Sequence, residues 1–375
     1  LPHIRSALAG ARERIDIELY ICASGALFEE WFGVLSGAVQ RGVRVRMVLD
    51  PVGSRDLSSA DRGHLEDAGI EVHWFNPPSL TRPLVSLVRD HRKLIIVDGE
   101  RAWTGGMGLL DEFDPRIHGT RGWLDAMVEC QGPVVEDWQE LFEQVLLLAD
   151  NRPITRGLRW RFDQYGALPP AELEPDITHA RVIAARGGRS NPLLRTLVRQ
   201  ILRARRDIWV CTPYFWPPRP LFEALLQAAR RGVRVRLTLA GRDTDNPPIR
   251  YAGRHLYAPL LEAGVEIAEY RPCFLHIKAA RVDSWSTLGS FNFDHWNSSW
   301  NLEANIEVVN QRFARTLEAL RLQLEPDCEV IEPHRWARRG PLARGAHAFW
   351  FWFGMRLIKL LKGLREAATA KPGKD

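Results

Sequence analysis

Apolar side chains recur along the first part of the chain with two alternating periods. Residues 4–14 keep them on one face of a helix, and residues 15–21 alternate apolar and polar positions as a strand does. Residues 27–40 predict another helix, which ends at Gly42, and residues 43–49 predict the next strand. Helices and strands that take turns in this way are typical of an α/β layered sandwich with a largely parallel or mixed sheet.

The same succession continues through the first half and returns in the second. Residues 70–75 predict a strand, and residues 92–98 are apolar in the middle, as in a strand buried on both faces. Further along, residues 194–205 and 221–230 predict helices on either side of a strand at residues 207–211. Both halves therefore predict the same alternation.

Short matching stretches indicate that the two halves are copies. The hexapeptide RGVRVR of Arg41–Arg46 recurs as Arg231–Arg236, 190 residues later. Ala68-Gly69 recurs as Ala263-Gly264 at an offset of 195 residues. Near-constant offsets indicate an internal duplication with small differences in loop length. We therefore expect two similar α/β units packed about a pseudo-two-fold axis.

A chemically reactive motif is repeated as well. Each half holds a histidine, a lysine two residues later and an aspartate seven residues after the histidine: His91, Lys93 and Asp98, then His276, Lys278 and Asp283. Positions two apart on a strand share a face, so the imidazole can attack or protonate a group whose charge the ammonium holds. The odd offset turns the aspartate to the other face, and we expect this third member of each catalytic set to act as an anchor.

A turn with glycine follows each motif. It contains Gly105-Gly106 in the first half, and Gly289, Ser290 and Asn292 in the second. A small residue lets the backbone approach a bound group, and serine, asparagine and main-chain N–H groups can donate to phosphate oxygens. We expect Gly106, Ser290 and Asn292 to bind substrate.

The doubled motif resembles the signature of the phospholipase D superfamily, HxKxxxxD twice in one chain, with each copy followed by a Gly-Gly or Gly-Ser turn. The resemblance implies one active site between the two units, whereas the residues alone also allow two domains with separate sites. It further implies that His91 is the nucleophile and His276 the acid and base. Asp125 and Glu303 occupy the positions of carboxylates that orient the histidines in this superfamily.

The chain departs from the superfamily pattern in two places. Gly108 stands where an asparagine is usual two residues after Gly106, so one phosphate donor is absent from the first half. The common Asp-x-Arg-Ser becomes Asp294-His295-Trp296-Asn297, which removes a cation. We expect the second change to make the acceptor side of the pocket wider or more apolar.

Other stretches resemble the bacterial cardiolipin synthases within this superfamily. They are Pro213-Tyr214-Phe215, Tyr270-Arg271-Pro272 and Asn301-Leu302-Glu303-Ala304-Asn305. The resemblance implies a phosphatidyltransferase that acts on phosphatidylglycerol, alone or with phosphatidylethanolamine, through a phosphohistidine.

Three other functions stay open. A phospholipase D-type hydrolase would use water in place of the lipid alcohol. A nuclease would be expected to show extended basic stripes with stacking aromatics, whereas the aromatics here gather in one apolar run near the end of the chain. An inactive lipid-binding scaffold would not need two intact motifs.

Composition narrows the class of protein without fixing the substrate. A chain of 375 residues is long enough for two domains, and its net charge of +5 suits an anionic partner, either lipid headgroups or nucleic acid. Its five cysteines are widely scattered, which favours reduced thiols over a disulfide framework or structural zinc. The sequence contains no cluster of acidic residues at metal-binding spacing, so we predict an enzyme without metal or cofactor.

The last part of the chain differs from the rest. Residues 345–355 form an apolar, aromatic run that is shorter than the ~20 residues needed to span a bilayer. Cations follow it at spacings of three: Arg356, Lys359, Lys362 and Arg365. We expect an interfacial helix that contacts an anionic membrane, with a helix that caps the core as the alternative.

These observations predict a division of the chain and a location. The first unit is expected at residues 1–150, a linker at residues 151–176, the second unit at residues 177–333 and the basic aromatic tail at residues 334–375. We expect a peripheral or monotopic protein of the bacterial cytoplasmic (inner) membrane, with phospholipids rather than nucleic acid as partners.

Overall fold

The computed structural model describes residues 1–81, 83–151, 168, 178–186 and 191–369, and it describes side chains as far as residue 364. The linker expected at residues 151–176 therefore lies almost entirely outside the described residues.

The first unit is built on a mixed six-stranded sheet of order β3-β2-β1-β4-β5-β7. Its strands are β1 (Arg14–Leu19), β2 (Arg44–Leu49), β3 (Glu71–Trp74), β4 (Lys93–Val97), β5 (Arg101–Gly105) and β7 (Met127–Gln131). Its helices are α1 (Pro2–Ala9), α2 (Ala26–Gln40), α3 (Ser59–Asp67), α4 (Pro115–His118) and α5 (Val134–Ala149). Strands β1, β2 and β3 are parallel, and β4 runs antiparallel to β1.

The second unit repeats that order within an eight-stranded sheet, β16-β11-β10-β9-β13-β14-β15-β8. Its strands are β8 (His179–Ala185), β9 (Asp207–Thr212), β10 (Arg234–Ala240), β11 (Glu266–Tyr270), β13 (Ala279–Val282), β14 (Trp285–Gly289), β15 (Glu303–Val309) and β16 (Cys328–Val330). Its helices are α6 (Pro192–Arg203), α7 (Arg219–Arg230), α8 (Pro247–Arg254), α9 (Tyr257–Glu262), α10 (Asn297–Trp300) and α11 (Gln311–Leu324). The run β11-β10-β9-β13-β14-β15 matches the six strands of the first sheet one for one, which confirms the predicted duplication.

The repeated hexapeptide has a structural reason in both units. Gly42 and Gly232 follow helices α2 and α7 with φ of +89° and +85°, a left-handed conformation that favours glycine at a helix end. The next residue, Val43 or Val233, is buried in the core, and its N–H bonds back into the helix. The same six residues therefore stop a helix and start a buried strand twice.

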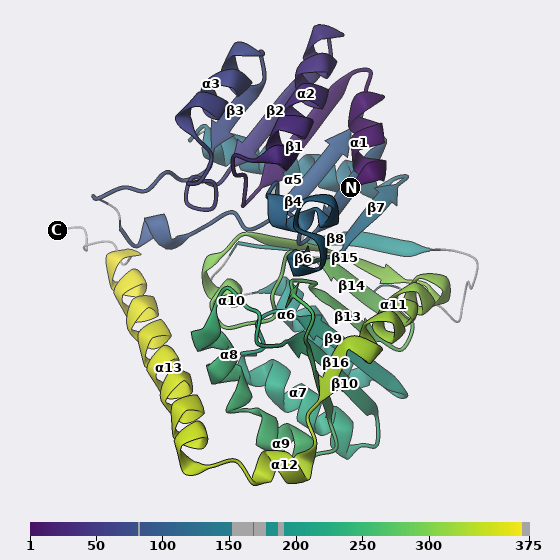
Figure 1. Cartoon of the computed structure of the whole chain (residues 1–375), viewed down its shortest axis with the longest axis vertical. Helices are drawn as coiled ribbons and strands as arrows, with labels where there is room; N and C mark the ends of the chain where they lie inside the picture. Colours follow the sequence, from purple (N-terminus) through teal and green to yellow (C-terminus); the bar gives the residue numbers. More distant parts are fainter. Residues whose placement is uncertain (82, 152–167, 169–177, 187–190, 370–375) are drawn as a thin grey trace, which may run out of the picture.

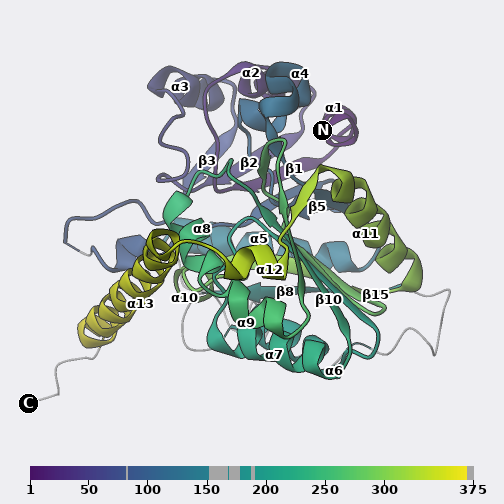
Figure 2. The same cartoon turned by 60° about the horizontal axis from the view of Figure 1, so that its bottom comes forward.

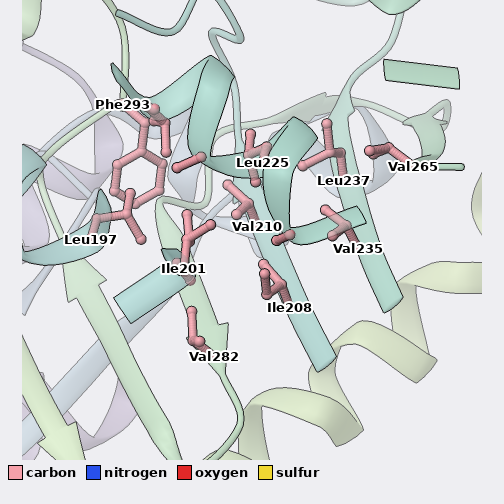
Figure 3. Close-up of a cluster of buried hydrophobic side chains, with 14 of the residues drawn as sticks. Leu197, Ile201, Ile208, Val210, Leu225, Val235, Leu237, Val265, Val282 and Phe293 are labelled. Carbon is pink, nitrogen blue, oxygen red and sulfur yellow. The ribbon is translucent and has the colours of Figure 1, made fainter. Parts of the chain in front are cut away.

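Each sheet buries one face under its helices. Figure 3 shows this core in the second unit, where Ile208, Val210, Val235 and Leu237 from β9 and β10 pack against Leu197, Ile201 and Leu225 from α6 and α7. The alternating strand positions and the helical stripe predicted from the sequence meet here.

The two units also share a core. Ile96 of β4, Trp138 of α5, and Val182, Leu302 and Ile306 of the second unit belong to one buried cluster. Figure 1 shows the first unit above and the second below, with β8 and β15 close to α5 and β4. A shared apolar interface of this kind fixes the position of one unit relative to the other.

The tail forms two further helices. Helix α12 (Pro333–Ala337) leads into α13 (Pro341–Thr369), which lies along the outside of the second unit beside α8 (Figures 1 and 2). Within the part of the chain that the structure describes, no helix is long and apolar enough to cross a membrane.

Candidate active site

Both motif histidines open into one cavity between the units. His91 precedes β4 and His276 precedes β13, and both line a cavity of about 400 Å³. Parallel strands β1, β9 and β10 all direct their carboxyl ends to this region, because Tyr20, Tyr214 and Asp245 from the loops after them also line it. The alternative of two separate sites is therefore wrong.

Short pairings across the interface hold the two histidines. Strand β12 (Phe274–Leu275) pairs with β6 (Trp123–Leu124), and an isolated bridge joins Asp90 to Leu302. As a result, the His276 N–H donates to the Leu124 carbonyl oxygen at 2.7 Å, and the His91 N–H donates to the Leu302 carbonyl oxygen at 3.0 Å. The sequence placed His276 and Lys278 on a strand, whereas the structure has them between β12 and β13.

Each imidazole meets a carboxylate of the opposite unit. His276 Nδ1 lies 2.6 Å from Asp125 Oδ2, and His91 Nδ1 lies 3.2 Å from Glu303 Oε2. Asp125 directly follows Leu124 and Glu303 directly follows Leu302, so one cross-unit contact positions both the backbone and the ring of each histidine. A carboxylate at Nδ1 sets the ring orientation and the tautomer, and leaves Nε2 available for chemistry.

The two motif lysines lie behind the histidines. Lys93 Nζ donates to the His91 carbonyl oxygen at 2.6 Å, and Lys278 Nζ donates to the His276 carbonyl oxygen at 2.5 Å. Both side chains are almost fully buried. Each ammonium therefore adds positive charge to the site while it holds the backbone of its own histidine.

Burial controls protonation in this cluster. It lowers the pKa of His91 and of His276 well below the ordinary value, and the two lysines lower both further. Burial also lowers the pKa of Lys93 to about 7, helped by Lys278, and lowers the pKa of Lys278 to about 8. The imidazoles are therefore neutral near pH 7, which is the form that can act as a nucleophile.

Burial has the opposite effect on the pKa of the two orienting carboxyl groups, because it disfavours their charged form. Burial raises the pKa of Asp125 to about 6 against the charge of Lys278, and raises the pKa of Glu303 to about 8 against the charge of Lys93. An anionic phosphate bound between the lysines would compensate their charge and favour a protonated imidazole. The site can thus supply both a neutral and a protonated histidine in one reaction.

Two residues expected to bind substrate lie against the carboxylates instead. Ser290 Oγ donates to Glu303, and a Cβ on Gly106 would come within 2.2 Å of the Asp125 carboxylate. Glycine at this position therefore leaves room for Asp125. The expectation that Ser290 and Gly106 contact the substrate stays a prediction.

Asn292 is the residue of the glycine turns that reaches the cavity. It lines the cavity wall, and its buried amide oxygen has no hydrogen-bond partner among the residues that the structure describes. The Cβ of any other residue at position 108 would come within 2.7 Å of the Ile21 carbonyl oxygen, so Gly108 fits a tight approach where the superfamily usually has an asparagine.

The motif aspartates are not brought to the cavity. Asp98 follows β4 and accepts hydrogen bonds from the backbone N–H groups of Arg12, Glu13 and Arg14. Asp283 does the same for Arg205, Arg206 and Asp207. Both carboxylates tie the far end of the histidine-bearing segment to the strand beside it, as an anchor would.

Several cavity residues were missed from the sequence. They are Tyr20, whose ring lies 4.9 Å from the His91 ring, Arg89, Tyr214 and Asp245. Tyr214 Oη donates to Asp245 Oδ1 at 2.5 Å. Their position in the sequence could have identified two of them, because Tyr20 and Tyr214 each follow the first parallel strand of their unit. Trp296, which replaces the usual arginine, also lines the cavity and makes that side apolar.

The chain is similar to known proteins over most of its length. The family model described as the phospholipase D-like domain of cardiolipin synthase matches residues 4–145 and 197–322. Cardiolipin synthase B of Escherichia coli K12 is 32% identical over 340 residues, which cover 88% of this chain and 79% of that protein. A cardiolipin synthase of Geobacillus kaustophilus is 34% identical over 80% of this chain and 59% of its own length.

A solved structure shares the fold. The phosphatidylserine synthase of Haemophilus influenzae superimposes with a TM-score of 0.74 at 16% identity, covering 96% of this chain and 92% of that chain. At such low identity the likeness supports the two-unit architecture alone. The family model and the relatives establish that this chain belongs to the cardiolipin synthase family of phospholipase D-like proteins.

Proposed function

We propose that this protein is a cardiolipin synthase-like phosphatidyltransferase that moves a phosphatidyl group from one phospholipid to the hydroxyl of another. The observation that carries the proposal is the pair of opposed histidines in one cavity, each with its Nδ1 held by a carboxylate. A phosphodiester transfer needs a nucleophile on one side of phosphorus and a proton donor on the other, and this arrangement offers both.

The first step forms a covalent intermediate. His91 Nε2 attacks the phosphorus of the donor lipid and forms a P–N bond, while the bond from phosphorus to the leaving alcohol oxygen breaks. His276 gives its proton to that oxygen, so the alcohol leaves neutral. The assignment of His91 as nucleophile rests on resemblance to the superfamily.

In the second step His276 acts as a base and the P–N bond to His91 breaks. His276, now neutral, accepts the proton of an incoming lipid hydroxyl, whose oxygen attacks phosphorus and releases His91. Lys93 and Lys278 stabilise the charge on the non-bridging oxygens, so the proposal needs no metal ion. We therefore expect the enzyme to stay active after metal ions have been removed with a chelator.

Phosphatidylglycerol is the proposed acceptor, and phosphatidylglycerol or phosphatidylethanolamine is the proposed donor. Support comes from the relatives, which are named cardiolipin synthases, and from Trp296, which lines the cavity in place of a cation. An apolar wall suits a lipid alcohol better than it suits water.

We also propose that α13 holds the protein on the anionic surface of the bacterial cytoplasmic (inner) membrane, as a peripheral or monotopic enzyme. Large apolar side chains are exposed on this helix, with Phe349 58%, Trp352 60% and Leu360 59% exposed. Arg356 and Lys359 are exposed beside them. An apolar helix face with neighbouring cations is typical of a helix in the headgroup layer.

Lipid product analysis tests the function. Purified protein is incubated with labelled phosphatidylglycerol, with and without phosphatidylethanolamine. The expected product is cardiolipin with release of glycerol or ethanolamine. Release of phosphatidic acid alone would replace the proposal by the hydrolase, and cleavage of oligonucleotides would replace it by the nuclease.

A further inference from the structure

The catalytic cavity extends beyond the reacting groups and changes character along its length. At one end lie His91, His276 and Asn292, and at the other lie Trp216 after β9 and Ile249 of α8. Helix α13 closes this second end with Trp350, Phe353, Gly354, Leu357 and Ile358. One cavity therefore joins an anion-binding end to an apolar end, which we call the apolar arm.

Helix α13 is packed closely enough to form a true wall. A Cβ on Gly354 would come within 2.5 Å of the Trp216 ring, so the helix lies directly on that ring because residue 354 is glycine. Trp216, Ala252 of α8 and Ile358 form a buried cluster behind the arm, with Trp350 and Trp296 against it. The arm is therefore bounded by side chains from three separate segments.

The same helix has a second face that the described part of the chain leaves exposed. Phe349, Trp352 and Leu360 point away from the cavity and are more than half exposed. Phe353 and Leu357 lie at the boundary between the cavity and the exposed face, because they line the cavity and are still 50% and 41% exposed. The apolar arm thus opens at the edge of the face that we assign to the membrane.

We propose that the apolar arm between α8 and α13 binds an acyl chain of the glycerophospholipid whose phosphodiester lies between His91 and His276. This inference rests on the proposed function and adds the position of the lipid tail. An anion site at one end and an apolar wall at the other fit one amphiphilic molecule, and a cavity of about 400 Å³ accommodates its headgroup and the first part of one chain. The rest of the chain leaves past Phe353 and Leu357 into the bilayer.

The energetic reason is burial of methylene groups. Each CH₂ that leaves water contributes ~0.8 kcal/mol, so even a short buried segment of chain separates a lipid from the same phosphodiester without acyl chains. Helix α13 then acts in two ways, as a membrane contact through one face and as part of the substrate site through the other.

Photocrosslinking separates these two faces without relying on turnover. A phosphatidylglycerol with a diazirine near the carbonyl end of one acyl chain is mixed, in vesicles of phosphatidylglycerol and phosphatidylcholine, with the His91→Ala variant, and labelled residues are mapped by mass spectrometry. Labels on Trp350, Leu357, Ile358 or Trp296 are expected. Labels confined to Phe349, Trp352 and Leu360 would overturn the proposal, whether or not the protein proves to make cardiolipin.

A matched pair of glycine variants provides the kinetic test. Gly354→Leu places a side chain where the arm meets Trp216, whereas Gly363→Leu adds the same apolar group to α13 at a position where no atom of another described element lies within 4 Å of its Cβ. Gly354→Leu is expected to lower kcat/KM at least tenfold for dioleoyl-phosphatidylglycerol and less than twofold for glycerophosphoglycerol, which has the same phosphodiester and no acyl chain. Gly363→Leu should change neither, and both variants should sediment equally with vesicles. Equal losses on the two substrates, or no loss with Gly354→Leu, would overturn the acyl-chain assignment.

Discussion

The Nδ1 atom of His276 lies 2.6 Å from Oδ2 of Asp125, a residue of the other unit and 151 positions away in the sequence. The pair of His91 and Glu303 repeats this relationship in the reverse direction, across 212 positions. Each motif histidine therefore takes its carboxylate partner from the opposite unit. Both units contribute to each of these pairs, and the shared core around Trp138 and Ile306 fixes the position of one unit relative to the other.

Replacing either orienting carboxylate is expected to slow chemistry while leaving the fold intact. In Asp125→Asn and Glu303→Gln the partner histidine loses the carboxyl group that fixes its tautomer, so kcat for cardiolipin formation should fall by ~10²–10⁴-fold, the usual contribution of acid and base catalysis. KM should change little. Single-turnover assays on phosphatidylglycerol measure the effect.

Glu329→Gln serves as the control, because Glu329 pairs with Arg271 on the surface. Its activity should match that of the unchanged protein. Activity within twofold of normal in Asp125→Asn would show that the short contact to His276 has no catalytic role.

The order of the two histidines can be tested with a lipid whose leaving group needs no proton. With phosphatidyl-p-nitrophenol as donor, His276→Asn should release p-nitrophenol in a burst and accumulate a phosphohistidine at His91. His91→Asn should give neither a burst nor a phosphoenzyme. Peptide mapping that finds the phosphate on His276 would reverse the assigned roles.

The pH dependence of kcat/KM should show a plateau that reaches from the acidic range to about pH 7. Because burial and the two lysines hold the pKa of His91 and His276 well below ~6.5, the nucleophile stays neutral into the acidic range and activity is lost only at a pH well below ~6.5. The alkaline limb should begin at pH 7–8, since the pKa of Lys93 is lowered to about 7 and that of Lys278 to about 8, and a neutral amine no longer stabilises the phosphate.

Lys93→Arg provides the corresponding control. A guanidinium keeps its charge across this range, so the alkaline limb should move to higher pH even where kcat falls. An unchanged protein that stays active up to pH ~10, the ordinary pKa of lysine, would show that the two ammonium groups are not destabilised by burial.

The fold could be predicted from the sequence because the patterns that define its helices and strands are local. The glycine stop and buried valine of RGVRVR form within a few residues, and the strand and helix periods around them need no partner to be recognised. The duplicated histidine motif was readable for the same reason. The anchoring position of the motif aspartates was expected from an unbroken strand, but in the structure Asp98 and Asp283 lie just after β4 and β13, in a left-handed backbone conformation.

The site could be predicted only in part, because the pairing of its side chains depends on contacts between segments that are distant in the sequence. Nothing in the sequence says that Asp125 serves His276 rather than His91, since that choice is made by the pairing of β6 with β12. Ser290 and Gly106 carry the right chemistry for phosphate, yet each lies against a carboxylate. The contact of α13 with Trp216 joins residues from opposite ends of the second half and could be seen only in three dimensions.

The anchoring role assigned to the motif aspartates leads to the last prediction. In Asp98→Asn the side chain keeps an oxygen acceptor but loses the charge that strengthens three hydrogen bonds from Arg12, Glu13 and Arg14. We expect the free energy of unfolding to fall by about 1–2 kcal/mol, with kcat unchanged for the folded protein at 25 °C. Urea unfolding and lipid assays on the same preparation measure the two effects.

The sign of its pH dependence follows from the direction of the shift. Burial alone would raise the pKa of Asp98, but the amides of Glu13, Arg14 and Arg12 outweigh it and lower the pKa. A depressed carboxyl pKa stabilises the fold above the unfolded value of ~3.9, and that stability is lost as the pH falls through the folded pKa. The gap in unfolding free energy between the unchanged protein and Asp98→Asn should therefore be constant from pH 7 to 5 and close below pH ~4. A large loss of kcat without loss of stability would instead make Asp98 part of the chemistry.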